Sequence, residues 1–128
     1  MSDLRPEFSQ LFEALRALYL GHQPAGVLLR DEPGNYSLAT HGVREKDGYR
    51  TWFGGAEIRK NYVSAHVMPV YIYPELLDGI SPALRKRMQG KACFNFKTAD
   101  DALFAELGGL IARGAARFEE DGRLNRPV

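Results

Sequence analysis

Apolar residues recur at helical spacing near both ends of the chain. In the first twenty residues they lie three or four positions apart, which predicts one helix from Pro6 to Leu20, with Gly21 at its C-cap. A second helix should begin near Thr98, with Asp101 as its capping partner. Its apolar stripe consists of Leu103, Leu107, Leu110, Ile111 and Phe118.

Three glycines lie within this second helix, and a short polar tail follows it. Each glycine costs about 1 kcal/mol relative to alanine in a helix interior. We therefore expect a stabilising contact that compensates for this cost, namely close packing of the helix on the sheet at Gly108, Gly109 and Gly114. The tail "DGRLNRPV", residues 121–128, is expected to fray.

Five segments between the helices have the composition and alternation of β-strands. The turn sequences "EPGN" and "REKDG" separate the first three. Gly54 and Gly55 predict a bulge or a close backbone approach, and Pro69 predicts an edge position or an early end to strand pairing. The segments are "AGVLLRD", expected to be buried, "YSLATHG", "YRTWFGGAEIRK", "NYVSAHVMPVYIY" and "KACFNFK".

The order of these elements predicts the fold class. Short helical turns are expected in "PELLDGI" and "SPALRKRM", with Ser81 as an N-cap and Pro82 as the first helical residue. The strands otherwise follow one another without helical crossovers, which favours antiparallel pairing. We therefore expect a single α+β domain over residues 1–128. A mostly antiparallel sheet of about five strands carries both terminal helices on one face, and its other face is at least partly open.

Composition narrows the function classes. The chain has 128 residues with 17 basic and 16 acidic side chains, a net charge of +1, so nucleic acid is an unlikely partner. Cys93 is the single cysteine, which excludes an intramolecular disulfide and fits a reducing compartment. We find no signal peptide and no apolar run of about 18 residues that would span a membrane. These features predict a cytoplasmic protein.

Residues 60–118 resemble the YdhG-like proteins, small bacterial proteins mostly of unknown function. The resemblance rests on "YVSAHV", on "MQGKACFNFK" and on "DDALFAELGGLI", which opens the terminal helix. The first half of the chain matches more loosely, through its opening helix and "YRTWFGG". The resemblance implies a frataxin-like fold, and it raises iron binding, since one member is considered an iron chaperone of the frataxin kind.

The residues depart from the frataxin pattern where iron would bind. Frataxin's metal-handling surface is a ridge of carboxylates on the first helix and first strand, and iron prefers clustered carboxylate oxygens. In this chain Arg5, Arg16 and Arg30 interrupt the acidic residues of those segments. The acidic residues are Asp3, Glu7, Glu13, Asp31 and Glu32. No metal site is predicted.

A basic run offers a candidate anion site. Arg85, Arg87, Lys91 and Lys97 lie within "RKRMQGKACFNFK", where arginine offers bidentate contacts and lysine a mobile charge. Gly90 would allow a turn whose N–H groups add donors. The alternative is structural: the basic residues solvate the last turn of a short helix, and Gly90 is its C-cap.

The open face of the sheet offers a second candidate. Alternation places Tyr62 and His66 on one face of the fourth segment, and with Trp52 and Cys93 on neighbouring strands they predict a shallow aromatic pocket. A covered sheet face or a dimer surface explains the same residues. Cys93 would serve as a nucleophile or a metal ligand if Lys91 or Lys97 activated it, but a free cysteine also behaves as a small hydrophobic residue.

Three functional hypotheses follow. The preferred one is a small non-enzymatic binding domain for an anionic small molecule or a protein partner. The alternatives are an iron-binding chaperone of the frataxin kind and an enzyme using Cys93 or His66. No catalytic residue is assigned and no cofactor is predicted, because the chain has no phosphate loop, dinucleotide fingerprint, nucleophile elbow or HExxH motif. The sequence leaves the oligomeric state open, and a dimer is possible.

Overall fold

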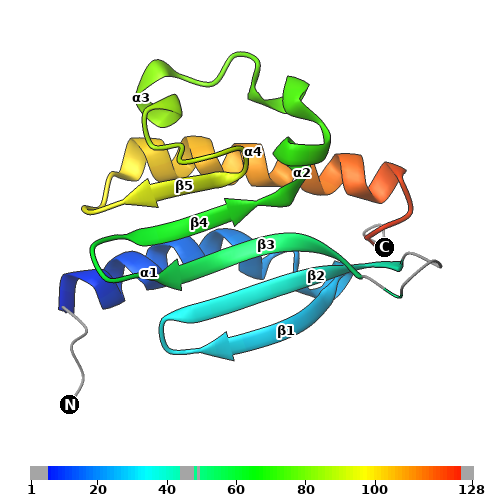
Figure 1. Ribbon diagram of the computed structural model, residues 1–128, viewed down its shortest axis with the longest axis horizontal. Coiled ribbons are helices and arrows are strands. Elements are labelled where there is room, and N and C mark those ends of the chain that lie inside the picture. The colour runs from blue at the N-terminus through cyan, green and yellow to red at the C-terminus, as the bar shows by residue number, and fades with distance from the viewer. Residues whose placement is uncertain (1–5, 44–47, 49, 125–128) are drawn as a thin grey trace.

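The computed structural model describes residues 6–43, 48 and 50–124. It has an α+β fold, in which a five-stranded antiparallel sheet in the order β1-β2-β3-β4-β5 carries two long helices (Figure 1). The main elements are α1 (Pro6–Leu20), β1 (Val27–Glu32), β2 (Asn35–Val43), β3 (Arg50–Ile58), β4 (Val63–Val67), β5 (Cys93–Phe96) and α4 (Asp101–Glu120). The short elements are η1 (Gln23–Ala25), α2 (Met68–Ile72), η2 (Pro74–Leu77) and α3 (Pro82–Arg85).

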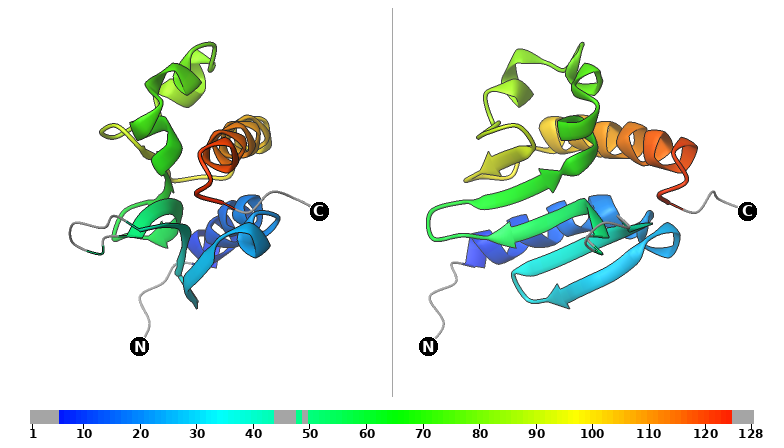
Figure 2. Two further views of the ribbon diagram at one scale, coloured as in Figure 1. Left: turned by 90° about the vertical axis from the view of Figure 1, so that its right-hand side faces the viewer. Right: turned by 45° about the vertical axis from the view of Figure 1, so that its right-hand side comes forward.

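Both long helices pack on the same face of the sheet. In the end-on view of Figure 2, α1 and α4 lie side by side on one side of it, and the α2–α3 segment extends past β5. The predicted stripe of α4 is buried except for Leu103, which is half-buried. Phe94 and Phe96 of β5 point into the same core, where the rings of Phe96 and Phe104 meet with centroids 5.0 Å apart. The predicted fold class is confirmed.

A bulge on the central strand β3 sets which residues face the core. Leu38 of β2 pairs with Gly54, whereas the next residue, Ala39, pairs with Trp52, so Phe53 is the extra residue. Gly54 has φ +152°, and a Cβ there would lie 2.0 Å from the carbonyl oxygen of His66, so no other residue fits. The bulge predicted at the two glycines is confirmed.

Two strand predictions need correction. β1 was expected to be buried, but all of it except Val27 is exposed, and the side chain of Leu29 is 57% exposed. The reason is topological, because β1 is an edge strand, and it meets α1 through the polar pair of Arg16 and Asp31. The fourth predicted strand ends at Val67, and Pro69 lies in the first turn of α2. Pairing therefore ends early, as Pro69 indicated, but residues 68–72 are helical.

Both ends of α4 also differ from expectation. The helix begins at Asp101, and Asp100 is its N-cap, where the carboxylate accepts a hydrogen bond from the backbone N–H of Leu103 at 3.1 Å. Beyond the helix, residues 121–124 do not fray. The carbonyl of Arg123 accepts a 2.7 Å hydrogen bond from the N–H of His41, and Leu124 is buried. Residues 125–128, and 44–47 of the predicted "REKDG" turn, lie outside the described residues.

The glycines of α4 allow close packing, although their partners are helices and not the sheet. A Cβ on Gly114 would lie 2.7 Å from the Cβ of Pro69 in α2, and one on Gly108 would lie 3.2 Å from Leu18 in α1. At Gly109 the nearest atom would be an Arg113 nitrogen at 3.7 Å, an ordinary contact. Gly114 is therefore the position in α4 where the close approach of α2 leaves no room for a side chain.

Gly114→Ala and Gly109→Ala form a matched pair that tests this packing. Alanine gains about 1 kcal/mol of helix propensity at either position. At Gly114 the new methyl group clashes with the rigid ring of Pro69, and overpacking of this kind costs about 1–3 kcal/mol. We expect urea denaturation to show that Gly114→Ala lowers the free energy of unfolding and that Gly109→Ala raises it. A Gly114→Ala variant more stable than wild type would show that α2 is not held this close to α4.

Candidate functional site

The basic run forms a hairpin whose second arm is β5 and whose first arm lies along the outer edge of β5. Met88 pairs with Phe94 across an antiparallel bridge. The N–H of Gln89 donates to the carbonyl of Cys93 at 2.9 Å, and the N–H of Asn95 donates to the carbonyl of Arg87 at 2.8 Å. Gly90, with φ +80°, lies in the turn between the two arms. We call residues 85–97 the basic hairpin. The basic side chains of this hairpin lie around two different hollows.

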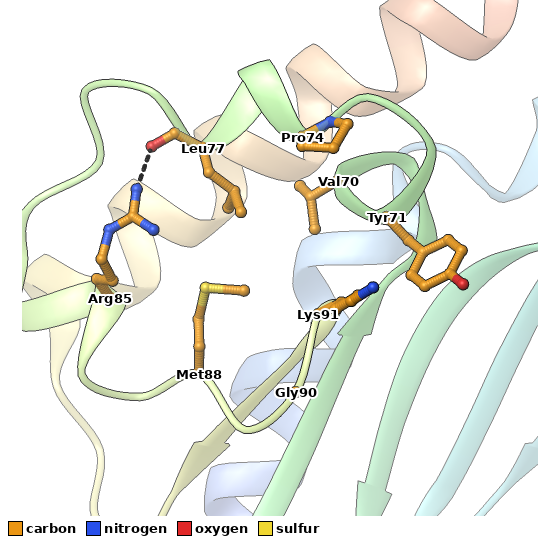
Figure 3. Close-up of a pocket in the computed structure, with 8 residues that line it drawn as sticks. All are labelled: Val70, Tyr71, Pro74, Leu77, Arg85, Met88, Gly90 and Lys91. Carbon is orange, nitrogen blue, oxygen red and sulfur yellow. Dashed lines mark hydrogen bonds between the residues drawn. The ribbon is translucent and has the colours of Figure 1, made fainter.

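The first group lines a hollow of about 540 Å³ between the basic hairpin and the α2–η2 segment (Figure 3). Figure 3 shows the side chains of Val70, Leu77 and Met88 pointing into this hollow, with Arg85 and Lys91 on opposite sides of it. We call it the apolar groove. Its lining residues are Val70, Tyr71, Pro74, Leu77, Arg85, Met88, Gly90 and Lys91.

The charged residues that line the apolar groove are Arg85 and Lys91, and both are cations. One guanidinium nitrogen of Arg85 donates to the carbonyl of Leu77 at 3.0 Å, which fixes the side chain at the rim. The ammonium of Lys91 lies 5.7 Å from the ring centroid of Tyr71, whose side chain is 55% exposed. Within the described part of the chain, neither cation forms an ion pair. The groove therefore combines an apolar interior with positive charge that no neighbouring carboxylate neutralises.

The second group of basic residues lies around a smaller, polar hollow of about 220 Å³. We call it the donor groove, and Met88 is the residue it shares with the apolar groove. Its lining residues are Tyr62, Lys86, Arg87, Met88, Gln89, Asn95 and Lys97. The four predicted anion ligands are thus divided, since Arg85 and Lys91 line one groove and Arg87 and Lys97 line the other.

On the open face of the sheet, the structure brings three of the four predicted pocket residues together. The indole N–H of Trp52 donates to the hydroxyl of Ser37 at 2.8 Å, and its ring lies 5.1 Å from that of His66. Nδ1 of His66 lies 2.9 Å from the sulfur of Cys93. Tyr62 is not part of this cluster, because it lines the donor groove instead.

Burial keeps the His66–Cys93 pair neutral. It lowers the pKa of His66 and raises the pKa of Cys93, so at neutral pH the contact joins a thiol and an uncharged imidazole. An activated cysteine nucleophile has the opposite arrangement, with a thiolate beside an imidazolium. Among the described residues, no carboxylate or carbonyl forms a hydrogen bond with the His66 ring to orient it. The pair therefore lacks the features that activate a nucleophile.

Three acidic residues of α1 and β1, Glu13, Asp31 and Glu32, are paired with Arg16 or Arg30. Arg16 donates two hydrogen bonds to the carboxylate of Asp31, at 2.8 and 2.7 Å, and this contact lowers the pKa of Asp31. Arg16 also lies 3.5 Å from Glu13, and Arg30 lies 3.2 Å from Glu32. No group of three or more potential metal ligands occurs within the part of the chain that the structure describes. Asp3 and Arg5 lie outside that part.

Comparisons of the chain with protein-family models, with curated proteins and with solved structures find no match. No helix among residues 6–43, 48 and 50–124 is long and apolar enough to cross a membrane. The sequence reasoning missed the apolar side of the first groove, notably Tyr71, Leu77 and Met88. Residues 61–73 were interpreted as one strand. Proline is common in the first turn of a helix, so Pro69 could have indicated that a helix begins there and that Tyr71 belongs to it.

Thiol reactivity tests the neutral pair. Since burial raises the pKa of Cys93, alkylation by iodoacetamide should be slower at pH 7.5 than for a cysteine in an unstructured peptide. Its rate should rise with pH to a midpoint above that of the peptide measured alongside. A rate that reaches its plateau below pH 7 would instead indicate a thiolate–imidazolium pair and would favour the enzyme hypothesis.

The pH dependence of stability tests the burial of His66. Its pKa is lower in the folded protein than in the unfolded chain, where it is about 6.5, so the unfolded chain binds more protons below that pH. The free energy of unfolding should therefore fall as the pH decreases from 7.5 to 5.5. His66→Gln should make this fall shallower, leaving the part due to His22, whose pKa burial also lowers. If urea titrations show that the free energy of unfolding depends on pH to the same extent in both proteins, His66 does not have a lowered pKa in the folded state.

Proposed function

We propose that this protein is a small non-enzymatic binding domain, and that its apolar groove holds a small molecule with an apolar or aromatic body and one anionic group. The observation that carries the proposal is the composition of the groove. Its interior is apolar, its charged lining residues are Arg85 and Lys91, and no carboxylate lines it. A ligand with an apolar body and one anionic group would contact the apolar interior and the two cations at the same time.

The dimensions and the preset geometry support this proposal. A volume of about 540 Å³ falls within the range of small-molecule sites, about 300–1,000 Å³. The hydrogen bond from Arg85 to Leu77 holds the guanidinium before any ligand arrives, which lowers the entropy lost on binding. Lys91 adds a charge on a flexible stem that can follow ligands of different length.

The two alternatives have less support. The enzyme hypothesis needs an activated group, and the neutral Cys93 thiol does not provide one. The iron hypothesis needs clustered carboxylates, whereas Asp31 and Glu32 are paired with arginines. The proposal retains the YdhG-like, frataxin-like and bacterial assignments and the cytoplasmic location as inferences from the sequence. The arrangement of two terminal helices on an antiparallel sheet supports the frataxin-like part of this proposal.

A matched pair of ligands tests the apolar groove. 1-Naphthoate and the neutral 1-naphthamide share one ring system and differ in charge. We expect naphthoate to bind about tenfold more tightly, since a hydrogen bond to a charged group contributes about 1.5–3 kcal/mol. Lys91→Ala should reduce this preference. Lys97→Ala removes the same charge outside the groove and should leave the preference unchanged.

Calorimetry and thermal shift would measure these affinities, because a ligand that binds only the folded state raises its stability. Equal affinity for the two compounds would show that the cations do not recognise the anion. An equal loss of affinity in Lys91→Ala and Lys97→Ala would point to a general charge effect and not to this groove.

A further inference from the structure

The donor groove presents hydrogen-bond donors from several elements to one small volume. The hydroxyl of Ser64 donates to Oδ1 of Asn95 at 2.6 Å, so the acceptor end of this amide is already engaged. The NH₂ end of Asn95, whose side chain lines the groove, has no protein partner within the described residues. Beside it are the cationic side chains of Lys86, Arg87 and Lys97. A lining of amide and cationic donors selects for a ligand that offers acceptors.

No carboxylate lines this groove, and its cations are exposed. Across residues 6–43, 48 and 50–124, none of the three cations forms an ion pair. Asp100 lines an adjacent hollow with Lys86 and Arg87, but its carboxylate caps α4 through the N–H of Leu103. The excess of positive charge is therefore local, although the chain as a whole carries a net charge of only +1.

We infer that the donor groove binds a small tetrahedral oxyanion, the phosphoryl group of a small molecule or inorganic phosphate. A volume of about 220 Å³ suits a compact group and not the larger apolar body proposed for the first groove. Arginine provides the forked donors that match adjacent phosphate oxygens, and lysine adds a point charge. The Asn95 amide sets the orientation, because the contact with Ser64 fixes which end faces the ligand.

This inference does not depend on the proposed function. Among the lining residues the two grooves share Met88 alone, and their cations are different residues. Lys91→Ala therefore serves as the matched control for the donor groove, as Lys97→Ala does for the apolar groove. Each variant removes one lysine charge from the same hairpin, so a general effect of net charge would appear in both.

Titration with sodium phosphate, followed by ¹⁵N-resolved NMR, tests the inference directly. We expect saturable shifts of the Asn95 side-chain amide signals that sodium chloride at equal ionic strength does not reproduce. Lys97→Ala should weaken phosphate binding about tenfold, the size of one charged hydrogen bond. Asn95→Asp keeps the acceptor for Ser64 but replaces the donors with a negative oxygen, so it should abolish binding. Backbone amide signals of the basic hairpin report this, because the variant has no side-chain amide at position 95. Lys91→Ala should bind like wild type.

Parallel titration with glycerol 1-phosphate separates the two sources of the oxyanion. Tighter binding of the ester would identify a phosphorylated small molecule, and tighter binding of inorganic phosphate would identify the free ion; either result supports the site. Shifts that chloride reproduces, or equal weakening by Lys97→Ala and Lys91→Ala, would overturn the inference. Unchanged phosphate binding by Asn95→Asp, with a dispersed spectrum that shows it is folded, would also overturn it.

Discussion

Phe53 joins both terminal helices to the sheet. It lies on the central strand and is fully buried, and its ring centroid lies 6.3 Å from that of Tyr19 in α1 and 6.1 Å from that of Phe118 in α4. Edge-to-face aromatic pairs of this kind contribute about 0.5–1.5 kcal/mol beyond the area they bury. Without the bulge at Phe53 and Gly54, regular alternation from the buried Ala56 would turn Trp52 to the helices and Phe53 to the open face.

The same bulge builds the opposite surface of the sheet. Because Trp52 faces outward, its indole reaches both Ser37 on β2 and His66 on β4. Both of these residues pair with Gly55, which has no side chain to obstruct a ring that crosses β3. On the core side, the hydroxyl of Tyr19 donates to the carbonyl of His66 at 2.8 Å. The open-face cluster is therefore held by the same backbone that supports the core.

Several features of the structure could be predicted from local signals in the sequence. The Ser81 cap, the glycine bulge and the alternation of Phe94 with Cys93 each depend on neighbouring residues, and each prediction is confirmed. The exposure of β1 was not predictable in this way, because it depends on which strand lies at the edge. The division of the basic residues depends on a bridge between Met88 and Phe94, a contact that charge and spacing alone do not reveal.

The two edges of the sheet are protected by different means, and this difference explains where the candidate sites lie. On β1 the pairing shifts at Leu29, and arginine–carboxylate pairs surround the strand, features that discourage pairing with another chain. On β5 the basic hairpin takes up the edge hydrogen bonds itself. Covering that edge requires a tight turn, and the turn distributes the cations over two grooves. The same hairpin thus protects the sheet edge with its backbone and presents positive charge with its side chains. Truncating a basic side chain removes charge and leaves the edge hydrogen bonds in place, whereas a change to the hairpin backbone alters both.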